Sequence, residues 1–388
     1  MRIAMIGQKG MPARYGGVER HVHDLSVRLV QAGNIVRVYS RSWYTGDTPT
    51  TVDGVEQLYL PSIHTKHLDT LTHTFLASIH ATRSNANIIH FHGVGPALWS
   101  WIPRVFSPRK RVVTTFHSID RKHEKWDWFA RLALRTGEWA ACRFAHKTIT
   151  VSRTLQQYAR DVYDKHTTYI PNAVPLYNRI KECKTLSQWG LNSGQYILVV
   201  TRLIPHKGVH HIIDAYQTLT KSHPELTKKY PLVIVGGGVH TETYVRALHD
   251  SARSNPNIIF TGFQSGRTLE ELFSGAHLYL HASSKEGLPI TVLEAMSHTL
   301  PALLSDIPEH QELILDQSMR FEPEDNRALV SALVKTLSAD TEFLQKQANK
   351  NRIRIEQEYQ WDHIVPQIIA LYERTQQKYS FSEEYIHI

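Results

Sequence analysis

The stretch HLYLHASSKEGLPITVLEAM, residues 277–296, contains the pattern that decides the fold. It starts with an apolar segment typical of a buried strand and passes through a short turn into a second apolar segment. Gly287 lets a ligand approach the backbone closely, and Pro289 suits a first helical turn, where its missing N–H costs nothing. A strand that ends in such a turn and continues as a helix is typical of parallel α/β proteins.

Two carboxylates, Glu286 and Glu294, lie on either side of this helix start. A carboxylate can accept two hydrogen bonds from a vicinal diol such as that of a ribose. Glu286 has an alternative explanation as a favourable charge near a helix N-terminus. Glu294 lies in the apolar context ITVLEAM, where an unpaired carboxylate would be costly. We therefore expect both to bind hydroxyl groups of one ligand, whose negative charge is met by the backbone N–H groups of Gly287 and Leu288.

The alternation of strand and helix runs through both halves of the chain. Apolar segments predict buried strands at 2–7, 34–40, 87–92 and 111–117, and again at 196–200, 231–238, 257–263, 277–283 and 301–306. Helical periodicity lies between most of them, beginning at Val18 in the first half. The turn-rich segment 169–195 is the expected linker, and a closing helix that breaks near Pro366 is expected from Trp361. This pattern predicts two doubly wound, Rossmann-like α/β domains, whose strand ends enclose a cleft if they face each other.

Composition favours an ordinary two-domain globular protein. The chain has 388 residues, of which 41% are hydrophobic and 21% charged, so extensive disorder is excluded. Cys142 and Cys183 show no metal-binding spacing and suit a reducing, cytoplasmic compartment. No apolar segment approaches the roughly 20 residues that cross a bilayer. DxD, HExxH, GxSxG and Walker A motifs are absent from the sequence, which predicts a protein without a metal or another cofactor.

The net charge of +8 is concentrated in the first half of the chain. Residues 1–175 contain 23 Lys and Arg against 12 Asp and Glu, whereas the remainder contains 21 against 24. A basic domain suggests an anionic partner, either nucleic acid or a membrane with anionic lipid, although charge that only confers solubility explains it equally well. The segments 97–113 and 118–135 mix Trp, Phe and basic residues, a composition that fits both a membrane interface and a core-facing helix with a basic outer face.

Further candidate residues follow the predicted strands. Arg202 and Lys207 come after the strand at 196–200 and precede a helix, which would make a diphosphate clamp, the alternative being two solvated loop cations. In the first domain, Gly16 and Gly17 make an anion-accepting turn beside Arg14. The glycines of this loop do not form a GxGxxG motif, so a nicotinamide site has weak support.

Two histidines, His92 and His117, each end a predicted strand. The chain contains 24 histidines, so a single one carries little information, and a structural role is the usual explanation. The position at the carboxyl end of a central strand makes His117 the stronger candidate for ligand binding.

Taken together, these motifs resemble the retaining glycosyltransferases of family 4, which have the GT-B fold. EGLPITVLE (286–294) resembles their E-x7-E signature, RYGGVERHV (14–22) their N-terminal Gly-Gly loop, and TRLIPHKGVHHIIDAY (201–216) their donor-phosphate loop. LVIVGGG, FTGF and LLSDIPEHQEL follow in the family's order, so the resemblance covers nearly the whole chain. The first half further resembles bacterial enzymes that build O-antigen or exopolysaccharide, some of them rhamnosyltransferases.

The resemblance implies a role for each matching donor-side residue. Arg202 and Lys207 would hold the donor diphosphate, and Glu294 would bind the nucleotide ribose. Glu286, with the N–H groups of Gly287 and Leu288, would orient the hydroxyls of the donor sugar. Leu288 stands where the family often has Phe.

On the other side of the cleft, Gly16 and Gly17 would face the donor phosphate and His117 the donor sugar. Arg14, His92 and Asp120 are candidates on the acceptor side. TFHSID (115–120) departs from the family's usual residues after this strand, which leaves the role of Asp120 open. The resemblance also implies domains at 1–172 and 173–360, with the helix 361–388 crossing back to the first.

The implied function is transfer of a sugar from a nucleotide-sugar, a substrate rather than a cofactor, to a hydroxyl of a glycan or polyprenyl-diphosphate-linked acceptor. The enzyme would act in the cytoplasm, at the inner face of the membrane, without metal and without nucleic acid. Two alternatives stay open from the sequence: a nucleotide-sugar 2-epimerase and a non-catalytic nucleotide-sugar-binding subunit.

Overall fold

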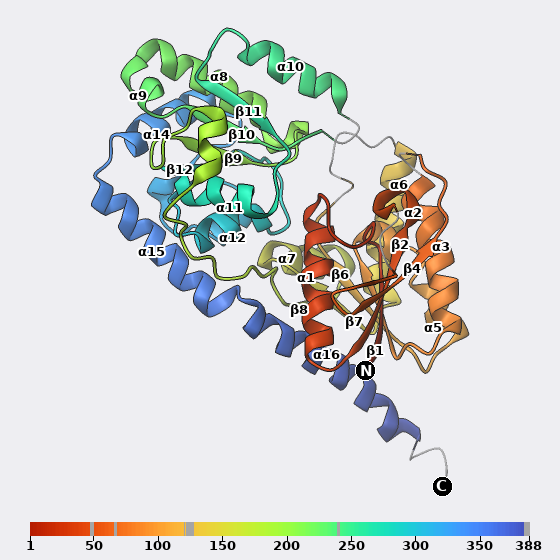
Figure 1. Cartoon of the computed structure of the whole chain (residues 1–388). Coiled ribbons are helices and arrows are strands. Elements are labelled where there is room, and N and C mark those ends of the chain that lie inside the picture. The colour runs from red at the N-terminus through yellow and green to blue at the C-terminus, as the bar shows by residue number, and fades with distance from the viewer. Residues whose placement is uncertain (47–49, 66–67, 120, 122–127, 239–240, 384–388) are drawn as a thin grey trace. The chain divides into compact units, whose positions relative to one another are not determined.

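The computed structural model describes residues 1–46, 50–65, 68–119, 121, 128–238 and 241–383. The chain forms two compact units (Figure 1). The first consists of Met1–Asn172 and Trp361–Ile388, and the second of Ala173–Gln360. Each unit contains one sheet with helices packed against it, as the alternating pattern predicted.

The first unit is built on an eight-stranded sheet. Its order is β3 (Thr51–Val52), β4 (Val55–Leu60), β2 (Ile35–Arg41), β1 (Arg2–Ile6), β5 (Ile88–His92), β6 (Arg111–Phe116), β7 (Lys147–Thr150) and β8 (Thr168–Tyr169). The neighbours pair in parallel except β3 and β4. Its helices are α1 (Gly17–Gln31), α2 (Ser42–Thr45), α3 (Leu68–Arg83), α4 (Val94–Ala97), α5 (Trp101–Phe106), α6 (Trp128–Arg143), α7 (Arg153–Tyr163) and α16 (Trp361–Glu383). The strand order changes direction between β1 and β5, where ligands bind in such sheets.

The second unit is built on a six-stranded, all-parallel sheet. Its order is β11 (Ile258–Gly262), β10 (Leu232–Val235), β9 (Ile197–Val200), β12 (Leu278–His281), β13 (Ala302–Ser305) and β14 (Arg320–Phe321). Its helices are α8 (Val209–Ser222), α9 (Pro224–Lys229), α10 (Glu242–Ala252), α11 (Gly266–Gly275), α12 (Ile290–Ser297), α13 (Pro308–Gln311), α14 (Asn326–Leu337) and α15 (Thr341–Glu358). The change of direction falls between β9 and β12, so the loops after these strands lie at its most favourable binding position.

The fold class predicted from the sequence is confirmed, but the expected break near Pro366 is wrong. Helix α16 continues through Pro366, although the missing N–H removes one intrahelical hydrogen bond. Apolar side chains on either side of the proline, Ile364 and Ile368, are buried, and α16 packs against α1 and β6. This packing stabilises the helix where local propensity alone would end it.

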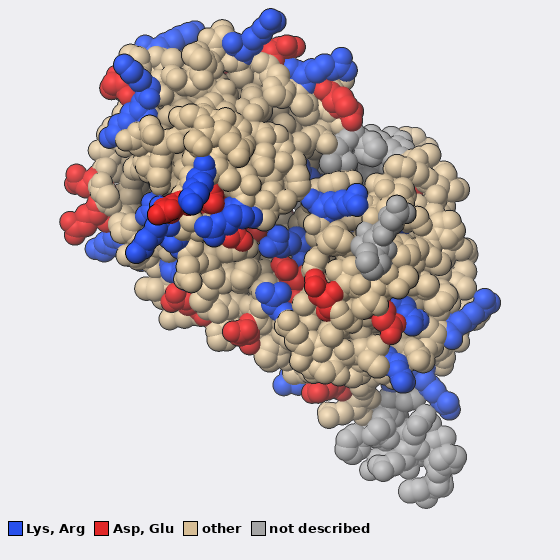
Figure 2. Space-filling view, in the orientation of Figure 1, with Lys and Arg blue, Asp and Glu red and all other residues tan. Residues whose placement is uncertain are grey.

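The exposed side chains can be compared with the basic and aromatic character that the sequence predicted for the first unit. On the face shown in Figure 2, Lys and Arg side chains occur at several places together with acidic side chains and do not form one continuous basic patch. Large apolar side chains on α5 and α6 are nevertheless exposed, with Phe106 at 70% and Trp128 at 76%. Within the described residues, none of the helices has the length and apolar character that a membrane span requires.

Candidate functional site

The strongest candidate site lies at the carboxyl ends of β9 and β12 in the second unit. The loop after β9 ends at Gly208, which has a φ of +67° and lies so close to the carbonyl of Ala282 that a Cβ would clash with it. The Ser284 N–H donates a 3.0 Å hydrogen bond to the His206 carbonyl. Only a glycine permits this contact between the two loops, and the contact brings Lys207 to Glu286.

Lys207 and Glu286 form a largely buried ion pair, in which Lys207 Nζ donates to Glu286 Oε1. The same carboxylate oxygen lies 2.8 Å from His281 Nε2, and the Ser283 hydroxyl lies 2.9 Å from that ring nitrogen. On the other side of the ring, the Tyr279 hydroxyl is 3.3 Å from His281 Nδ1. Glu286 is therefore fixed by neighbours on β12 and its following loop as well as by Lys207.

The electrostatics of this pair keep the carboxylate ionised. Burial alone would raise the pKa of Glu286, but the charge of Lys207 and the hydrogen bond from His281 hold it well below its ordinary value. Burial also lowers the pKa of His310, which lies beside this group, to about 3, so this imidazole is neutral at physiological pH. The site thus combines one ionised carboxylate, one buried cation and neutral imidazoles.

The remaining donor-side residues surround this pair. Arg202 is exposed in the loop after β9 and acts electrostatically on Lys207. Glu294 is 8% exposed on α12, and burial together with the charges of Glu286 and Glu294 raises the pKa of Tyr279. Both glutamates of the predicted pair therefore act on one buried phenol. Gly287 and Leu288 are buried in the turn before α12.

In the first unit, the Gly-Gly loop forms the start of α1. Gly16 has a φ of 103° and precedes the first helical residue, Gly17. The Arg14 N–H donates to the Tyr44 hydroxyl over 2.7 Å, and its guanidinium donates to the Thr45 carbonyl over 3.0 Å. The loop is thereby attached to α2, with the exposed Arg14 at its surface.

The two candidate histidines of the first unit lie in contact. His92 Nδ1 is 3.3 Å from His117 Nε2, and the two side chains are only 2% and 8% exposed. His21, on α1, completes a group of three, although nothing in the sequence distinguished it from the other histidines. Burial lowers the pKa of His92 well below its ordinary value. Asp120 lies outside the described residues.

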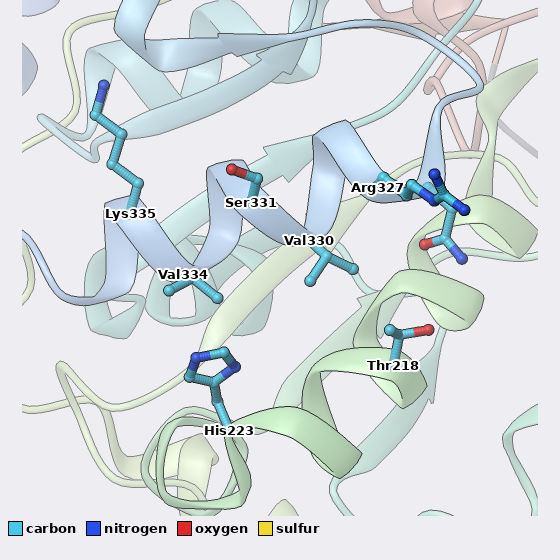
Figure 3. Close-up of a pocket in the computed structure, with 8 residues that line it drawn as sticks. Thr218, His223, Arg327, Val330, Ser331, Val334 and Lys335 are labelled. Carbon is cyan, nitrogen blue, oxygen red and sulfur yellow. The ribbon is translucent and has the colours of Figure 1, made fainter.

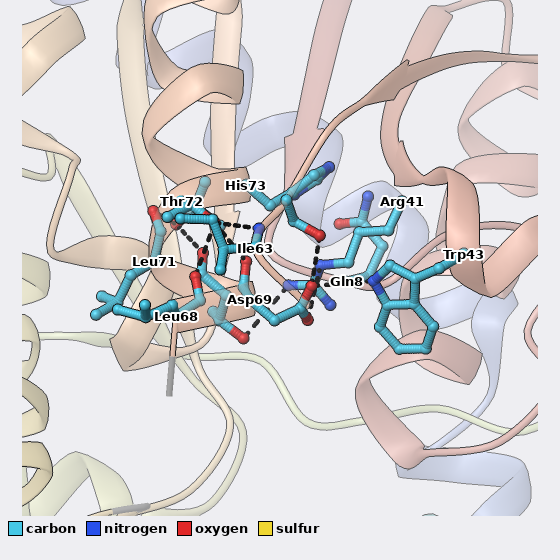
Figure 4. A network of polar contacts seen from close by, with 12 residues as sticks. Gln8, Arg41, Trp43, Ile63, Leu68, Asp69, Leu71, Thr72 and His73 are labelled. Atoms are coloured by element: carbon cyan, nitrogen blue, oxygen red, sulfur yellow. Dashed lines mark hydrogen bonds and ion pairs between the residues drawn. The ribbon is translucent and has the colours of Figure 1, made fainter. Parts of the chain in front are cut away.

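Sequence reasoning also missed a buried ion pair in the first unit. Arg41 Nε lies 3.3 Å from Asp69 Oδ2, with the arginine side chain 1% exposed (Figure 4). The indole N–H of Trp43 and the Ser62 hydroxyl donate to Asp69 Oδ1 over 3.0 and 2.6 Å. The positions are 28 residues apart, and neither local pattern marks them as partners.

A pocket of about 500 Å³ lies elsewhere in the second unit, between α8 and α14. Val330 and Val334 of α14 point towards His223, which follows α8, whereas Lys335 points away (Figure 3). None of the predicted site residues lines this pocket. Its lining includes His223, Arg327 and Lys335 but no carboxylate, and it lies away from the carboxyl ends of the strands, so it is not the candidate active site.

Two α/β units, each with a largely parallel sheet and polar residues at its strand ends, are the arrangement found in GT-B glycosyltransferases. The family model for glycosyl transferases group 1 matches residues 186–354, and that for glycosyltransferase family 4 matches residues 15–177. The chain belongs to these glycosyltransferases.

Known relatives cover nearly the whole length of the chain. O-antigen chain mannosyltransferase C of Escherichia coli is 24% identical over 382 residues, covering 96% of this chain and 98% of the relative. The structure of sucrose-phosphate synthase from Thermosynechococcus elongatus has a TM-score of 0.81 at 20% identity, covering 96% and 98%. That of Anabaena Alr3699/HepE in complex with UDP and glucose has a TM-score of 0.78 at 20% identity, covering 96% and 99%. These likenesses establish the GT-B fold.

Proposed function

We propose that this glycosyltransferase moves a sugar from a nucleotide-sugar to an acceptor hydroxyl with retention of the anomeric configuration. The observation that carries the proposal is the Lys207–Glu286 pair at the point where the strand order reverses. Among the described residues, Glu286 Oε1 is the single hydrogen-bond acceptor of the Lys207 ammonium group, which has three donors. Glu286 Oε2 accepts no hydrogen bond from a described residue. One cation and one carboxylate oxygen thus have capacity for a ligand.

The proposed mechanism assigns the main stabilisation to the leaving group. Negative charge develops on the departing diphosphate, where Lys207 and Arg202 supply positive charge without the help of a metal ion. Glu294 binds the ribose, and Glu286 orients the sugar hydroxyls. We assign no carboxylate to the face beneath the anomeric carbon, so the acceptor attacks from the leaving-group face and a donor phosphate oxygen takes its proton. Trapping of a sugar covalently bound to Glu286 would contradict this mechanism.

Gly17 and His117 are proposed as donor contacts from the first unit. His117 Nε2 faces His92 Nδ1, so His92 would orient the ring rather than meet the acceptor directly. Arg14 is exposed and stays the acceptor-side candidate.

The proposed acceptor is a glycan on a polyprenyl diphosphate at the cytoplasmic face of the membrane. The full-length relative from Escherichia coli is named as an O-antigen chain mannosyltransferase, which supports a role in cell-surface polysaccharide synthesis. The exposed Val105 and Phe106 at the end of α5 and Trp128 at the start of α6 suit an interfacial contact. Activity on vesicles should fall at high salt and without anionic lipid, and unchanged activity would refute the membrane contact.

The test is a calorimetric titration of UDP, GDP and dTDP, each with EDTA, into wild type and Glu294→Ala. One nucleotide should bind wild type and lose at least about tenfold in affinity to the variant, or about 1.4 kcal/mol. Glu242→Ala, an exposed glutamate at the start of α10, is the matched control and should bind normally. If no nucleotide binds, or if Glu294→Ala binds as wild type does, the assignment fails. Product analysis with the matching donor then separates transfer from epimerisation and from binding alone.

A further inference from the structure

Three buried imidazoles meet in the first unit, each contributed by a different element. His21 comes from α1, His92 ends β5 and His117 follows β6. One ring nitrogen from each lies within 4.8 Å of the others. The three side chains are 3%, 2% and 8% exposed, so the group lies under the surface at the carboxyl edge of the sheet.

The spacing of the three rings matches that of a tetrahedral metal centre. Zn–N bonds of about 2.0–2.1 Å at tetrahedral angles place two ligand nitrogens about 3.4 Å apart and the ring centroids about 5 Å apart. His92 Nδ1 and His117 Nε2 are 3.3 Å apart. The ring centroids of His21 lie 5.0 Å from His117 and 5.7 Å from His92, and those of His92 and His117 are 5.5 Å apart.

Two further contacts suit metal ligation. The ring nitrogen of His92 that does not face His117, Nε2, lies 3.4 Å from Met5 Sδ. A ligating histidine commonly donates its second ring N–H to an acceptor, usually an oxygen, which fixes the tautomer and the orientation of the ring, and here the weaker acceptor Met5 Sδ occupies that place. His21 Nδ1 is buried without a hydrogen-bond partner among the described residues. A buried polar atom without a partner is costly, and a bound cation would satisfy it.

The neighbouring histidine does not belong to the ligand set. His90 uses both ring nitrogens, at 2.7 Å from the Tyr372 hydroxyl and 2.7 Å from the Thr115 hydroxyl. The ring centroids of His90 and His92 are 4.0 Å apart, so His90 packs against the His92 ring. A second group in the other unit, His281, Glu286 and His310, is a weaker candidate, because Lys207 already neutralises its carboxylate.

We propose that His21, His92 and His117 bind one first-row transition-metal ion with the preferences of Zn²⁺ and leave its fourth position open. Three imidazoles without a carboxylate suit Zn²⁺, Cu²⁺ or Ni²⁺, whereas Mg²⁺ and Ca²⁺ prefer oxygen ligands. Because the proposed function uses His117 as a contact of the donor sugar, the bound ion competes for that ring and inhibits transfer. This inhibitory role rests on the proposed function, whereas metal binding itself does not.

Metal binding is tested on the full chain after treatment with a chelator and dialysis. Co²⁺ should give intense visible absorption bands from a tetrahedral centre in the wild type, and Zn²⁺ should displace it with a stoichiometry of one per chain. His21→Gln should bind Zn²⁺ at least about tenfold more weakly. His73→Gln is the matched control, because His73 is equally buried with its Nδ1 unpartnered but lies outside the group. It should bind Zn²⁺ as wild type does.

Two results would overturn the site: wild type without tetrahedral Co²⁺ bands, or His21→Gln with unchanged Zn²⁺ affinity. If circular dichroism shows that His21→Gln is unfolded, His92→Gln takes its place, and the wild-type spectrum decides in either case. Nucleotide binding measured in EDTA does not involve these ligands, so failure of the metal site leaves the proposed function intact. Conversely, Co²⁺ bands and stoichiometry report the metal site even if no transfer is detected. Zn²⁺ should reduce transfer by wild type more than by His21→Gln, and equal inhibition would refute the inhibitory role.

Discussion

A buried ion pair lies near the carboxyl edge of the sheet in each unit, and the two pairs differ in how the oxygens of the carboxylate are used. In the first unit, Asp69 accepts hydrogen bonds from Trp43 and Ser62 on one oxygen and faces Arg41 with the other. In the second unit, Lys207 and His281 share one oxygen of Glu286.

The difference separates an ion pair that holds the fold from one that is ready for a ligand. Both oxygens of Asp69 are engaged by protein groups, so this carboxylate offers nothing further to a ligand, and removal of one partner leaves an uncompensated charge. In the Lys207–Glu286 pair, two N–H donors of Lys207 and the second oxygen of Glu286 have no partner among the described residues. The two side chains are 11% and 8% exposed. The pair therefore has the capacity to exchange part of its pairing for contacts with an anionic, hydroxyl-rich substrate.

The largest effect is expected from breaking the Arg41–Asp69 pair. Asp69→Ala should lower the free energy of unfolding by about 3–5 kcal/mol, because Arg41 stays buried without its counter-ion. Nucleotide affinity of the folded fraction should not change. Denaturant unfolding measures the loss, and the double variant Arg41→Met/Asp69→Leu should recover most of it. Glu56→Ala, which removes an ion pair with Arg37 that is 45% exposed on the glutamate side, is the control and should cost less than about 1 kcal/mol. A similar small cost for Asp69→Ala would contradict the distinction.

Lys207→Met tests the pair that is ready for a ligand. It should lower kcat about 10²–10³-fold, equivalent to about 2.7–4 kcal/mol of transition-state stabilisation, because the leaving diphosphate loses a fixed positive charge. Steady-state kinetics with the identified donor measures this loss. Lys285→Met, one residue before Glu286 on the exposed surface, is the matched control. Should both variants keep wild-type kcat, Lys207 would be a structural cation like Arg41.

The sequence predicted the fold to the extent that local pattern determines it. Buried and partly buried parallel strands give largely apolar runs, which is why β1, β2, β5, β6 and the first five strands of the second unit were found. Strand β4 was missed because its sequence VEQLYL contains the adjacent polar residues Glu56 and Gln57 and is mostly only partly buried. Strand β14 has two residues and owes its existence to pairing with β13.

The residues of the candidate sites also divide into those that a local motif predicted and those that only the tertiary structure brings together. Lys207 and Glu286 were predicted because each belongs to a local motif after a strand, and the fold then brings the two motifs together. The pairing of Arg41 with Asp69 and the contact of His21 with His92 arise from tertiary structure alone. Neither residue pair shares a local pattern, so no reading of short segments could have joined them.

His73, which is buried near Arg41, makes the stability of the first unit depend on pH. Burial and the charge of Arg41 lower its pKa from the ordinary 6.5 to about 4. The folded state therefore binds fewer protons than the unfolded state between these values, so stability is full above pH 6.5 and declines as pH falls towards 4. The decline should reach about 2 kcal/mol at pH 5. Denaturant unfolding of wild type and His73→Leu at pH 7.5 and 5.0 measures it, and the variant should lack this part of the decline. Equal pH dependence in both would show that His73 is not buried in its neutral form.

The last effect concerns the glycine that brings Lys207 to Glu286. Gly208→Ala should cost more than the roughly 1–2 kcal/mol that its φ of +67° costs alone, because its Cβ would also clash with the Ala282 carbonyl. Relief of that clash must separate the two loops, so nucleotide affinity should fall together with stability. Gly190→Ala provides the matched control, since Gly190 has a φ of +64° but open space around it. It should carry only the cost of its φ, with nucleotide affinity unchanged. If the two variants bind nucleotide equally, the contact between the loops does not organise the site, and the Lys207–Glu286 pair forms without it.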